Sequence, residues 1–111
     1  MNTKQITSIA VNALEDLKGE NIVVIDTTKM SSLFNAIIIC SGKSTRQVSA
    51  LAHNVTEDFK SKGIKIIGVE GKKGGEWVLV DSGEVVVHIM LPKVRDYYTI
   101  EELWNSDHSQ E

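Results

Sequence analysis

The sequence predicts a single α/β domain in which helices pack on a mixed sheet of about five strands. Three observations support this fold class. Continuous apolar runs are typical of strands buried on both faces, and amphipathic segments of helical period are typical of helices that cover a sheet. A chain of 111 residues, of which 41% are hydrophobic and 24% charged, also suffices for one core. The expected order of elements is α-β-β-α-β-β-β-α.

The first three elements occupy the N-terminal part of the chain. Residues 3–18 are expected to form a helix, because their apolar side chains recur at steps of three and four and Gly19 follows as a typical helix-ending residue. Two continuous apolar runs, 22–26 and 34–40, lack the alternation of a half-exposed sheet and predict buried strands. The polar residues 27–32 between them predict a loop or a helical turn.

The middle of the chain predicts a second helix and a third strand. Ser44 and Gln47 have the spacing of a capping box and mark the start of the helix, which Gly63 ends. Residues 64–69 then form an apolar run typical of a strand. The Gly-Lys-Lys-Gly-Gly segment at 71–75 is expected to be a mobile basic loop.

The next two strands are predicted to form a hairpin. Residues 77–81 and 84–90 are both apolar runs, and the Ser-Gly pair between them is typical of a tight turn. Pro92 is the only proline of the chain and is expected to end the second of these strands. Residues 93–98 are expected to form an irregular connection.

The chain is predicted to finish with a short helix and a tail. Thr99 and Glu102 have the spacing of a second capping box, which would open a helix that runs through Trp104. Residues 106–111 are polar and are expected to be a flexible C-terminal tail, so that the domain itself spans residues 1–105.

The distribution of charge favours a basic or apolar partner over nucleic acid. Residues 1–73 carry ten basic and seven acidic side chains, whereas residues 74–111 carry two basic and eight acidic ones, which together give the formal net charge of −3. Nucleic-acid binding draws much of its affinity from clustered Lys and Arg. We therefore expect no direct, sequence-specific contact with nucleic acid.

The sequence also indicates a compartment. Cys40 is the single cysteine and cannot form a disulfide within the chain. No apolar run approaches the ~18 residues of a membrane span, and the first residues resemble neither a secretory signal nor an organellar presequence. We expect a cytoplasmic protein with no membrane partner and with Cys40 as a buried thiol.

A nucleotide site is only weakly indicated. The Ser-Gly-Lys-Ser-Thr segment at 41–45 lies between a strand and a helix and resembles the end of a phosphate-binding loop. Ile37 stands where that pattern requires its first glycine, and a helix N-cap at Ser44 explains the same residues.

The sequence likewise gives little indication of a metal site or a catalytic site. The histidines and Cys40 are distributed one per element, without the short spacing of metal ligands. We expect no catalytic residue, no metal and no cofactor. The alternative function is a small nucleotidyltransferase-like enzyme that would use the Gly42-Lys43 loop with the carboxylate of Asp26 or Asp81.

The predicted hairpin leaves an apolar second face on the sheet. If Val78 and Val80 face the helices, alternation places the intervening side chains on the opposite side. These side chains are Trp77, Leu79, Asp81, Val86, His88 and Met90, and Tyr97, Tyr98 and Trp104 follow in the chain. Two interpretations stay open: a small satellite core under the C-terminal helix, or a protein-docking surface. His88 is equally open, and as a structural residue it would bond a neighbour such as Asp81.

Several segments together resemble the ribosomal silencing factor family, which is also called RsfS or Iojap. The most specific are Glu-Trp-Val-Leu-Val-Asp at 76–81 and Gly-Glu-Val-Val-Val-His at 83–88. The other matching segments are 38–44, 46–48, 52–55, 70–71, 89–90, 95–98 and 103–104. The resemblance covers nearly the whole chain, and Asn35-Ala36 departs from the pair that many relatives have before the apolar strand.

The resemblance implies both a fold and a function. The fold would be similar to that of nucleotidyltransferases but without their catalytic acids. The protein would bind ribosomal protein fourteen of the large ribosomal subunit, block association with the small subunit and repress translation when nutrients are scarce. A homodimer is also implied. The matching candidates for the docking surface are Trp77, Asp81, His88, Met90, Arg95, Tyr98 and Trp104.

Overall fold

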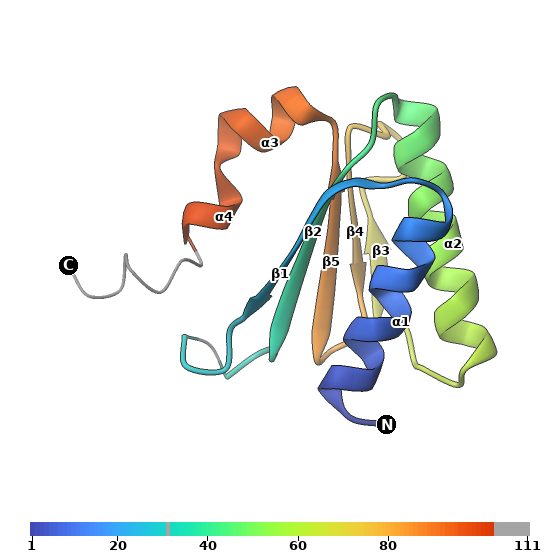
Figure 1. The fold of residues 1–111 in the computed structure, drawn as a ribbon, viewed down its shortest axis with the longest axis vertical. Coiled ribbons are helices and arrows are strands. Elements are labelled where there is room, and N and C mark those ends of the chain that lie inside the picture. Colours follow the sequence, from blue (N-terminus) through green and yellow to red (C-terminus); the bar gives the residue numbers. More distant parts are fainter. Residues whose placement is uncertain (31, 104–111) are drawn as a thin grey trace.

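A five-stranded mixed sheet forms the centre of the protein (Figure 1). In chain order the elements are α1 (Thr3–Asp16), β1 (Glu20–Asp26), β2 (Ala36–Ser41), α2 (Thr45–Ser61), β3 (Gly68–Glu70), β4 (Trp77–Asp81), β5 (Val85–Met90), α3 (Pro92–Tyr98) and α4 (Ile100–Leu103). This computed structural model describes residues 1–30 and 32–103. The strand order is β1-β2-β5-β4-β3, and only β2 and β5 run parallel. The predicted single α/β domain with a mixed sheet is confirmed. The strand expected at 22–26 is not buried as predicted, because β1 lies at the edge of the sheet and its side chains are half exposed or exposed.

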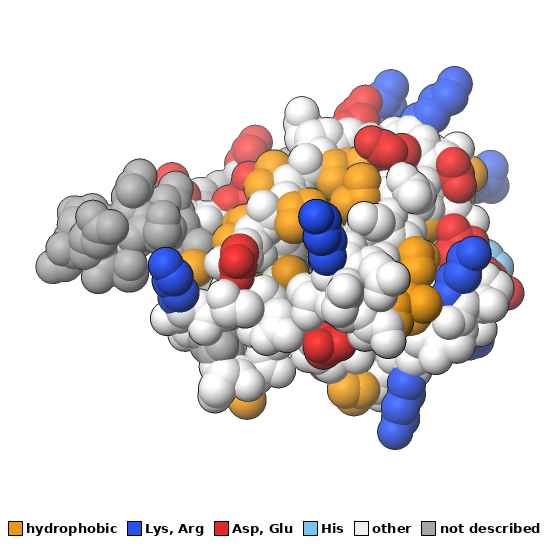
Figure 2. Space-filling model, turned by 60° about the horizontal axis from the view of Figure 1, so that its bottom comes forward, with side chains coloured by type: hydrophobic (Ala, Val, Ile, Leu, Met, Phe, Trp, Pro, Cys, Tyr) orange, Lys and Arg blue, Asp and Glu red, His pale blue; other side chains and the backbone are white. Residues whose placement is uncertain are grey.

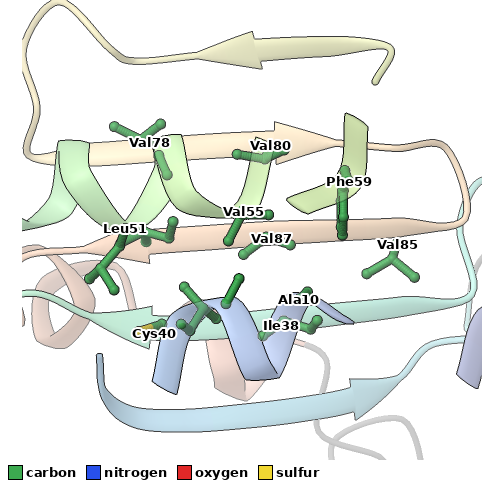
Figure 3. Close-up of a cluster of buried hydrophobic side chains, with 14 of the residues drawn as sticks. Ala10, Ile38, Cys40, Leu51, Val55, Phe59, Val78, Val80, Val85 and Val87 are labelled. Carbon is green, nitrogen blue, oxygen red and sulfur yellow. The ribbon is translucent and has the colours of Figure 1, made fainter. Parts of the chain in front are cut away.

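Helices α1 and α2 cover one face of the sheet, as predicted (Figure 1). Their buried side chains interdigitate with those of the three central strands, and Val55 and Val87 lie in the middle of this core (Figure 3). The same layer contains Cys40, whose side chain is fully buried. The side chains of the hairpin that face the helices alternate along its strands, as the sequence pattern predicted. They are those of Val78, Val80, Val85, Val87 and Ile89.

Both long helices begin at side-chain caps. The Oδ1 of Asn2 accepts from the backbone N–H of Gln5 at 2.9 Å, and the Oε1 of Gln5 accepts from the N–H of Asn2. Ser44 caps α2 by accepting from the N–H of Gln47 at 3.1 Å, as expected. The return bond differs, because the Gln47 side chain accepts from the N–H of Lys43 at 2.6 Å. Asn2 and Gln5 are an N-terminal signal that the sequence analysis missed.

The third strand is shorter than the predicted 64–69. Pairing with β4 starts at Gly68, which lies opposite Asp81, the last residue of β4. Residues 64–67 therefore extend past the end of their neighbour and have no continuous ladder, although the N–H of Ile67 still donates to the carbonyl of Asp81 at 2.7 Å. The glycine-rich segment 71–75 forms the turn between β3 and β4.

The segment 93–98 is helical, which corrects the irregular connection expected there. Pro92 occupies the first turn of α3, where its fixed φ favours a helix and its missing N–H costs nothing. Thr99 ends α3 in the left-handed conformation, and its hydroxyl donates to the carbonyl of Tyr98. The predicted capping box therefore does not form, although α4 follows directly. Trp104 and the tail predicted at 106–111 lie outside the described residues.

Helices α3 and α4 lie on the other side of the sheet from α1 and α2 (Figure 1). They form a second, smaller core with one end of that face, which contains Ile37, Ile39, Met90 and Ile100. The partly buried Trp77 and Val94 pack against this cluster. The satellite core is thus present, and it covers only part of the second face. No helix of residues 1–30 and 32–103 has the length and apolar character that crossing a bilayer requires.

Candidate functional site

A groove of about 570 Å³ lies on the second face of the sheet, beside the part that α4 covers. Its floor comes from β2, β5 and β4 through Ile37, Val86 and Leu79. Ile100 of α4 lines one side, and Ile67, 63% exposed, lines the rim near the β4–β5 turn. Figure 2 looks obliquely at the end of the sheet that carries this turn and shows hydrophobic side chains at the surface between charged ones.

His88 and Trp77 form a bonded pair at the inner end of the groove. The indole Nε1 of Trp77 donates to the Nδ1 of His88 at 3.0 Å, and the two rings lie 5.9 Å apart at an angle of 47°. The register explains the contact, because Leu79 lies opposite His88 and Trp77 is its diagonal neighbour. Burial lowers the pKa of His88 to about 4, so the imidazole is neutral at neutral pH.

Asp81 is not the partner of His88, which corrects the expectation from sequence. Its Oδ1 accepts from the N–H of Gly83 at 2.8 Å within the β4–β5 turn. Gly83 has a φ of +93°, which side-chain-bearing residues rarely adopt. Asp81 thus fixes the turn and at the same time lines the groove as an acidic group.

An aromatic cluster continues from the groove along α3. The rings of Trp77 and Tyr98 lie 5.0 Å apart, and those of Tyr98 and Tyr97 also lie 5.0 Å apart, edge to face. Tyr97 is 81% exposed and Tyr98 is 53% exposed. Exposed aromatic side chains adjoining an apolar groove are the composition found at the centres of protein interfaces.

Arg95 is buried and connects α3 and α4 to the sheet. Its Nη1 donates to the Oγ of Ser41 at 2.9 Å, and its Nε donates to the Oε1 of Glu101 at 2.7 Å. The hydrogen bond from Arg95 holds the pKa of Glu101 below its ordinary value. Met90, on β5 beneath these helices, is fully buried. Both residues support the surface from within.

The structure therefore brings together four of the seven candidates at the groove and its rim. Trp77, Asp81, His88 and Tyr98 adjoin the groove or its aromatic rim, while Met90 and Arg95 lie under it and Trp104 is outside the described residues. Sequence reasoning assigned six of the lining residues neither to the apolar face nor to the candidates, namely Leu33, Phe34, Ile37, Ile67, Gly83 and Ile100. The alternation of Ile37 with the helix-facing Ile38 was an available signal for one of them.

The groups of the alternative enzyme do not converge. Gly42 follows β2 at the end where its N–H donates to the carbonyl of Met90, whereas Asp26 and Asp81 lie at the opposite end of the sheet, ~17 Å away along a six-residue strand. Asp26 on β1 and Asp81 on β4 are separated by three strand spacings, or ~14 Å. Two carboxylates that bind one divalent ion must lie much closer together.

The remaining reactive groups are held in structural positions. Lys43 pairs with Glu20 across 3.4 Å at an exposed site. Burial raises the pKa of the Cys40 thiol to about 11, which disfavours the nucleophilic thiolate and agrees with the predicted buried thiol. In the described part of the chain, no group of three or more His, Cys, Asp or Glu side chains is placed to hold a metal ion.

Comparison with known proteins gives one consistent result. The family model described as "Ribosomal silencing factor during starvation" matches residues 1–111. The ribosomal silencing factor RsfS of Chromobacterium violaceum is 54% identical over 104 residues, which are 94% of this chain and 85% of the relative. That of Bacillus subtilis is 38% identical over 104 residues, 94% of this chain and 88% of the relative.

Solved structures agree with these sequence matches. A crystal structure of a Chromobacterium violaceum protein superimposes with a TM-score of 0.93 at 54% identity, covering 94% of this chain and 87% of the other. A Bacillus halodurans protein gives a TM-score of 0.84 at 37% identity, covering 92% and 95% of the two chains. The fold is therefore shared with these two solved structures.

Proposed function

The chain belongs to the ribosomal silencing factor family, and we propose that it binds ribosomal protein fourteen of the large subunit and blocks joining of the small subunit. The membership itself establishes a role in ribosome-related regulation of translation. The particular partner and the steric mechanism are the proposed part. By blocking subunit joining, the protein would repress translation when nutrients are scarce. It would act in the cytoplasm without catalysis.

The groove and its aromatic rim are the observation that supports docking of a protein. Leu79, Val86 and Ile37 form an apolar floor that α3 and α4 leave open. A half-covered apolar sheet face bordered by exposed Tyr97 and Tyr98 is costly to leave in water. A protein partner would bury this surface.

The net charge of the segment that supplies β4, β5, α3 and α4 supports a basic partner. Residues 74–103, which include β4, β5, α3 and α4, carry six acidic and two basic side chains. One of the two bases, Arg95, is already paired with Glu101. The acidic balance of this segment, with Asp81 in the groove itself, attracts a basic ribosomal protein and repels exposed RNA phosphates.

A small protein can silence a much larger particle by occupying one patch. A standard protein interface buries ~800 Å² on each partner. The two ribosomal subunits must approach closely over a broad face, so a bound domain on that face prevents their contact. No chemical step is required.

Co-sedimentation tests the proposal. The chain is incubated with purified large subunits, with purified small subunits and with isolated ribosomal protein fourteen, and bound protein is separated by pelleting or affinity capture. The proposal expects binding to the large subunit and to protein fourteen alone. Binding to large subunits without binding to protein fourteen would refute the partner, and no binding to large subunits would refute the function.

A further inference from the structure

His88 presents an unused hydrogen-bond donor on the floor of the groove. Its Nδ1 accepts the indole N–H of Trp77 at 3.0 Å, so Nδ1 carries no hydrogen. A neutral imidazole with an accepting Nδ1 must carry its single hydrogen on Nε2. Because burial keeps the imidazole neutral, the tautomer is fixed and the donor has a defined position.

This donor faces the groove. No residue of 1–30 or 32–103 accepts a hydrogen bond from Nε2 of His88. In that same part of the chain, every fully enclosed side-chain nitrogen or oxygen has a hydrogen-bond partner. The unpartnered Nε2 must therefore retain accessible surface, and the groove is the space that His88 lines.

Asp81 supplies the complementary acceptor on the same floor. It lies two residues beyond Leu79 on β4, and Leu79 is directly opposite His88, which makes Asp81 the diagonal neighbour of His88 on one face. Diagonal neighbours in an antiparallel pair are ~7–8 Å apart. Two residues of an extended chain span ~7 Å. The backbone positions of His88 and Asp81 are thus separated by about two residues of an extended peptide.

We infer that the groove recognises an extended basic segment of the partner protein, with a carbonyl oxygen on the Nε2–H of His88 and a Lys or Arg beside Asp81. The inference rests on the proposed function and specifies which groups of the partner this surface selects. A main-chain carbonyl suits His88 better than a carboxylate, because the neighbouring Asp81 would repel a second negative charge. The apolar floor at Leu79 and Val86 takes the aliphatic part of the segment.

Two substitutions at His88 distinguish the role of its Nδ1 acceptor from that of its Nε2 donor. In His88→Asn the Oδ1 takes the place of Nδ1 and still accepts from Trp77, but no donor remains at the Nε2 position. In His88→Gln the side-chain amide takes the place of Nε2 and keeps the donor there. Affinity for isolated large subunits is measured by fluorescence anisotropy of the labelled chain. We expect His88→Asn to weaken binding about 10-fold and His88→Gln to stay within about 3-fold of wild type.

The contribution of the Asp81 charge to binding is tested by measuring affinity as a function of salt concentration. Asp81→Asn removes the charge and keeps an acceptor for the N–H of Gly83. We expect about 10-fold weaker binding at low ionic strength and a flatter dependence of affinity on salt. Glu57→Gln on the outer side of α2 is the matched control and should leave both unchanged.

Further measurements separate failure of this inference from failure of the proposed function. Long-range proton–nitrogen NMR correlations report the tautomer of His88, and hydrogen on Nδ1 would overturn the inference. Wild-type affinity of His88→Asn would also overturn it, while the function would stand if Leu79→Glu in the same groove abolished binding. A groove filled by a second copy of the chain, seen as a dimer that both Leu79→Glu and His88→Asn dissociate, would overturn it as well.

Discussion

The Nε1 of Trp77 lies 3.0 Å from the Nδ1 of His88, and this hydrogen bond joins β4 to β5 across the diagonal of the hairpin. It satisfies two polar groups that would otherwise be costly in an apolar layer. It also makes Nδ1 an acceptor, so the single hydrogen of the imidazole, which burial keeps neutral, lies on the nitrogen that points away from Trp77. A structural contact in the sheet thereby sets the chemistry of the groove.

The pair predicts a loss of stability in mild acid. The pKa of His88 is lowered from 6.5 to about 4 in the folded protein, so the unfolded state binds a proton more readily than the folded state between these values. The free energy of unfolding should fall by about 2 kcal/mol from about pH 7.5 to about pH 5 through this residue alone. Urea unfolding at both pH values measures it. The drop should be absent in His88→Asn, and an equal drop in that variant would show that other groups cause it.

We expect the buried Arg95 to contribute to stability and the exposed Lys93 of the same helix to contribute little. Arg95→Met leaves the hydroxyl of Ser41 and the carboxylate of Glu101 without their donor, and we expect the free energy of unfolding to fall by about 1–3 kcal/mol. Lys93→Met, at an exposed position of α3, is the control and should change it by less than about 0.5 kcal/mol. Equal effects of the two variants would argue against the buried connection.

The stabilising effect of the Arg95–Glu101 pair should depend on pH, in a more acidic range than the effect of His88. Its pKa is lowered by the hydrogen bond from Arg95, so its stabilising effect is complete above the ordinary pKa of a glutamate and disappears as acid protonates the folded carboxylate. The advantage of wild type over Glu101→Gln should therefore be largest at neutral pH and vanish in strong acid. Chemical unfolding of both proteins as a function of pH tests this. An advantage that grows in acid would contradict the assignment.

Position 71 is expected to require glycine because its backbone lies against that of Trp77. Its φ is +87°, and a Cβ built there would collide with the carbonyl oxygen of Trp77. Gly71→Ala should lower the free energy of unfolding by more than about 1 kcal/mol. Gly74→Ala in the same loop is a matched control, because a Cβ there meets open space. Thermal unfolding of both variants gives the comparison, and an unchanged midpoint for Gly71→Ala would refute the steric argument.

Cys40 predicts a thiol that reacts only after unfolding. Its side chain is fully buried and its pKa is raised to about 11 by burial. A thiol reagent at neutral pH should modify the native protein far more slowly than the protein in urea. Rapid modification without denaturant would show that this part of the core opens readily.

The fold and the open face were predictable because both depend on local periodicity. Alternation in 77–81 and 84–90 identified the two faces of the hairpin, and continuous apolar runs identified the buried strands β2 and β5. The run at 22–26 identified β1 as a strand, but β1 lies at the edge of the sheet and is half exposed. The length of β3 was not predictable, since it depends on where β4 ends and not on the residues of 64–67. The helix at 92–98 could have been read from Pro92, which favours helix starts as well as strand ends.

The site was only partly predictable because register and strand order are long-range properties. Asp81 was the candidate partner of His88, but Trp77 and Asp81 are both diagonal neighbours of His88 in this register. The indole of Trp77 makes the bond, whereas Asp81 accepts from the N–H of Gly83 in the turn. The contribution of Ile37 requires β2 to lie beside β5, a parallel pairing that element order does not specify. The separation of Gly42 from Asp26 and Asp81 likewise emerges only from the assembled sheet.

A subunit-joining assay with Leu79→Glu tests the central claim most directly. Purified large and small subunits are mixed with wild-type protein, with Leu79→Glu in the groove, or with Val24→Glu, which places the same charge at a residue 48% exposed on the edge strand β1. Joined ribosomes are then measured by sucrose-gradient sedimentation. Wild type and Val24→Glu should prevent joining, and Leu79→Glu should lose the effect by at least about 10-fold in the concentration required. Normal joining in the presence of wild-type protein, or full activity of Leu79→Glu, would contradict the proposal that this groove silences the large subunit.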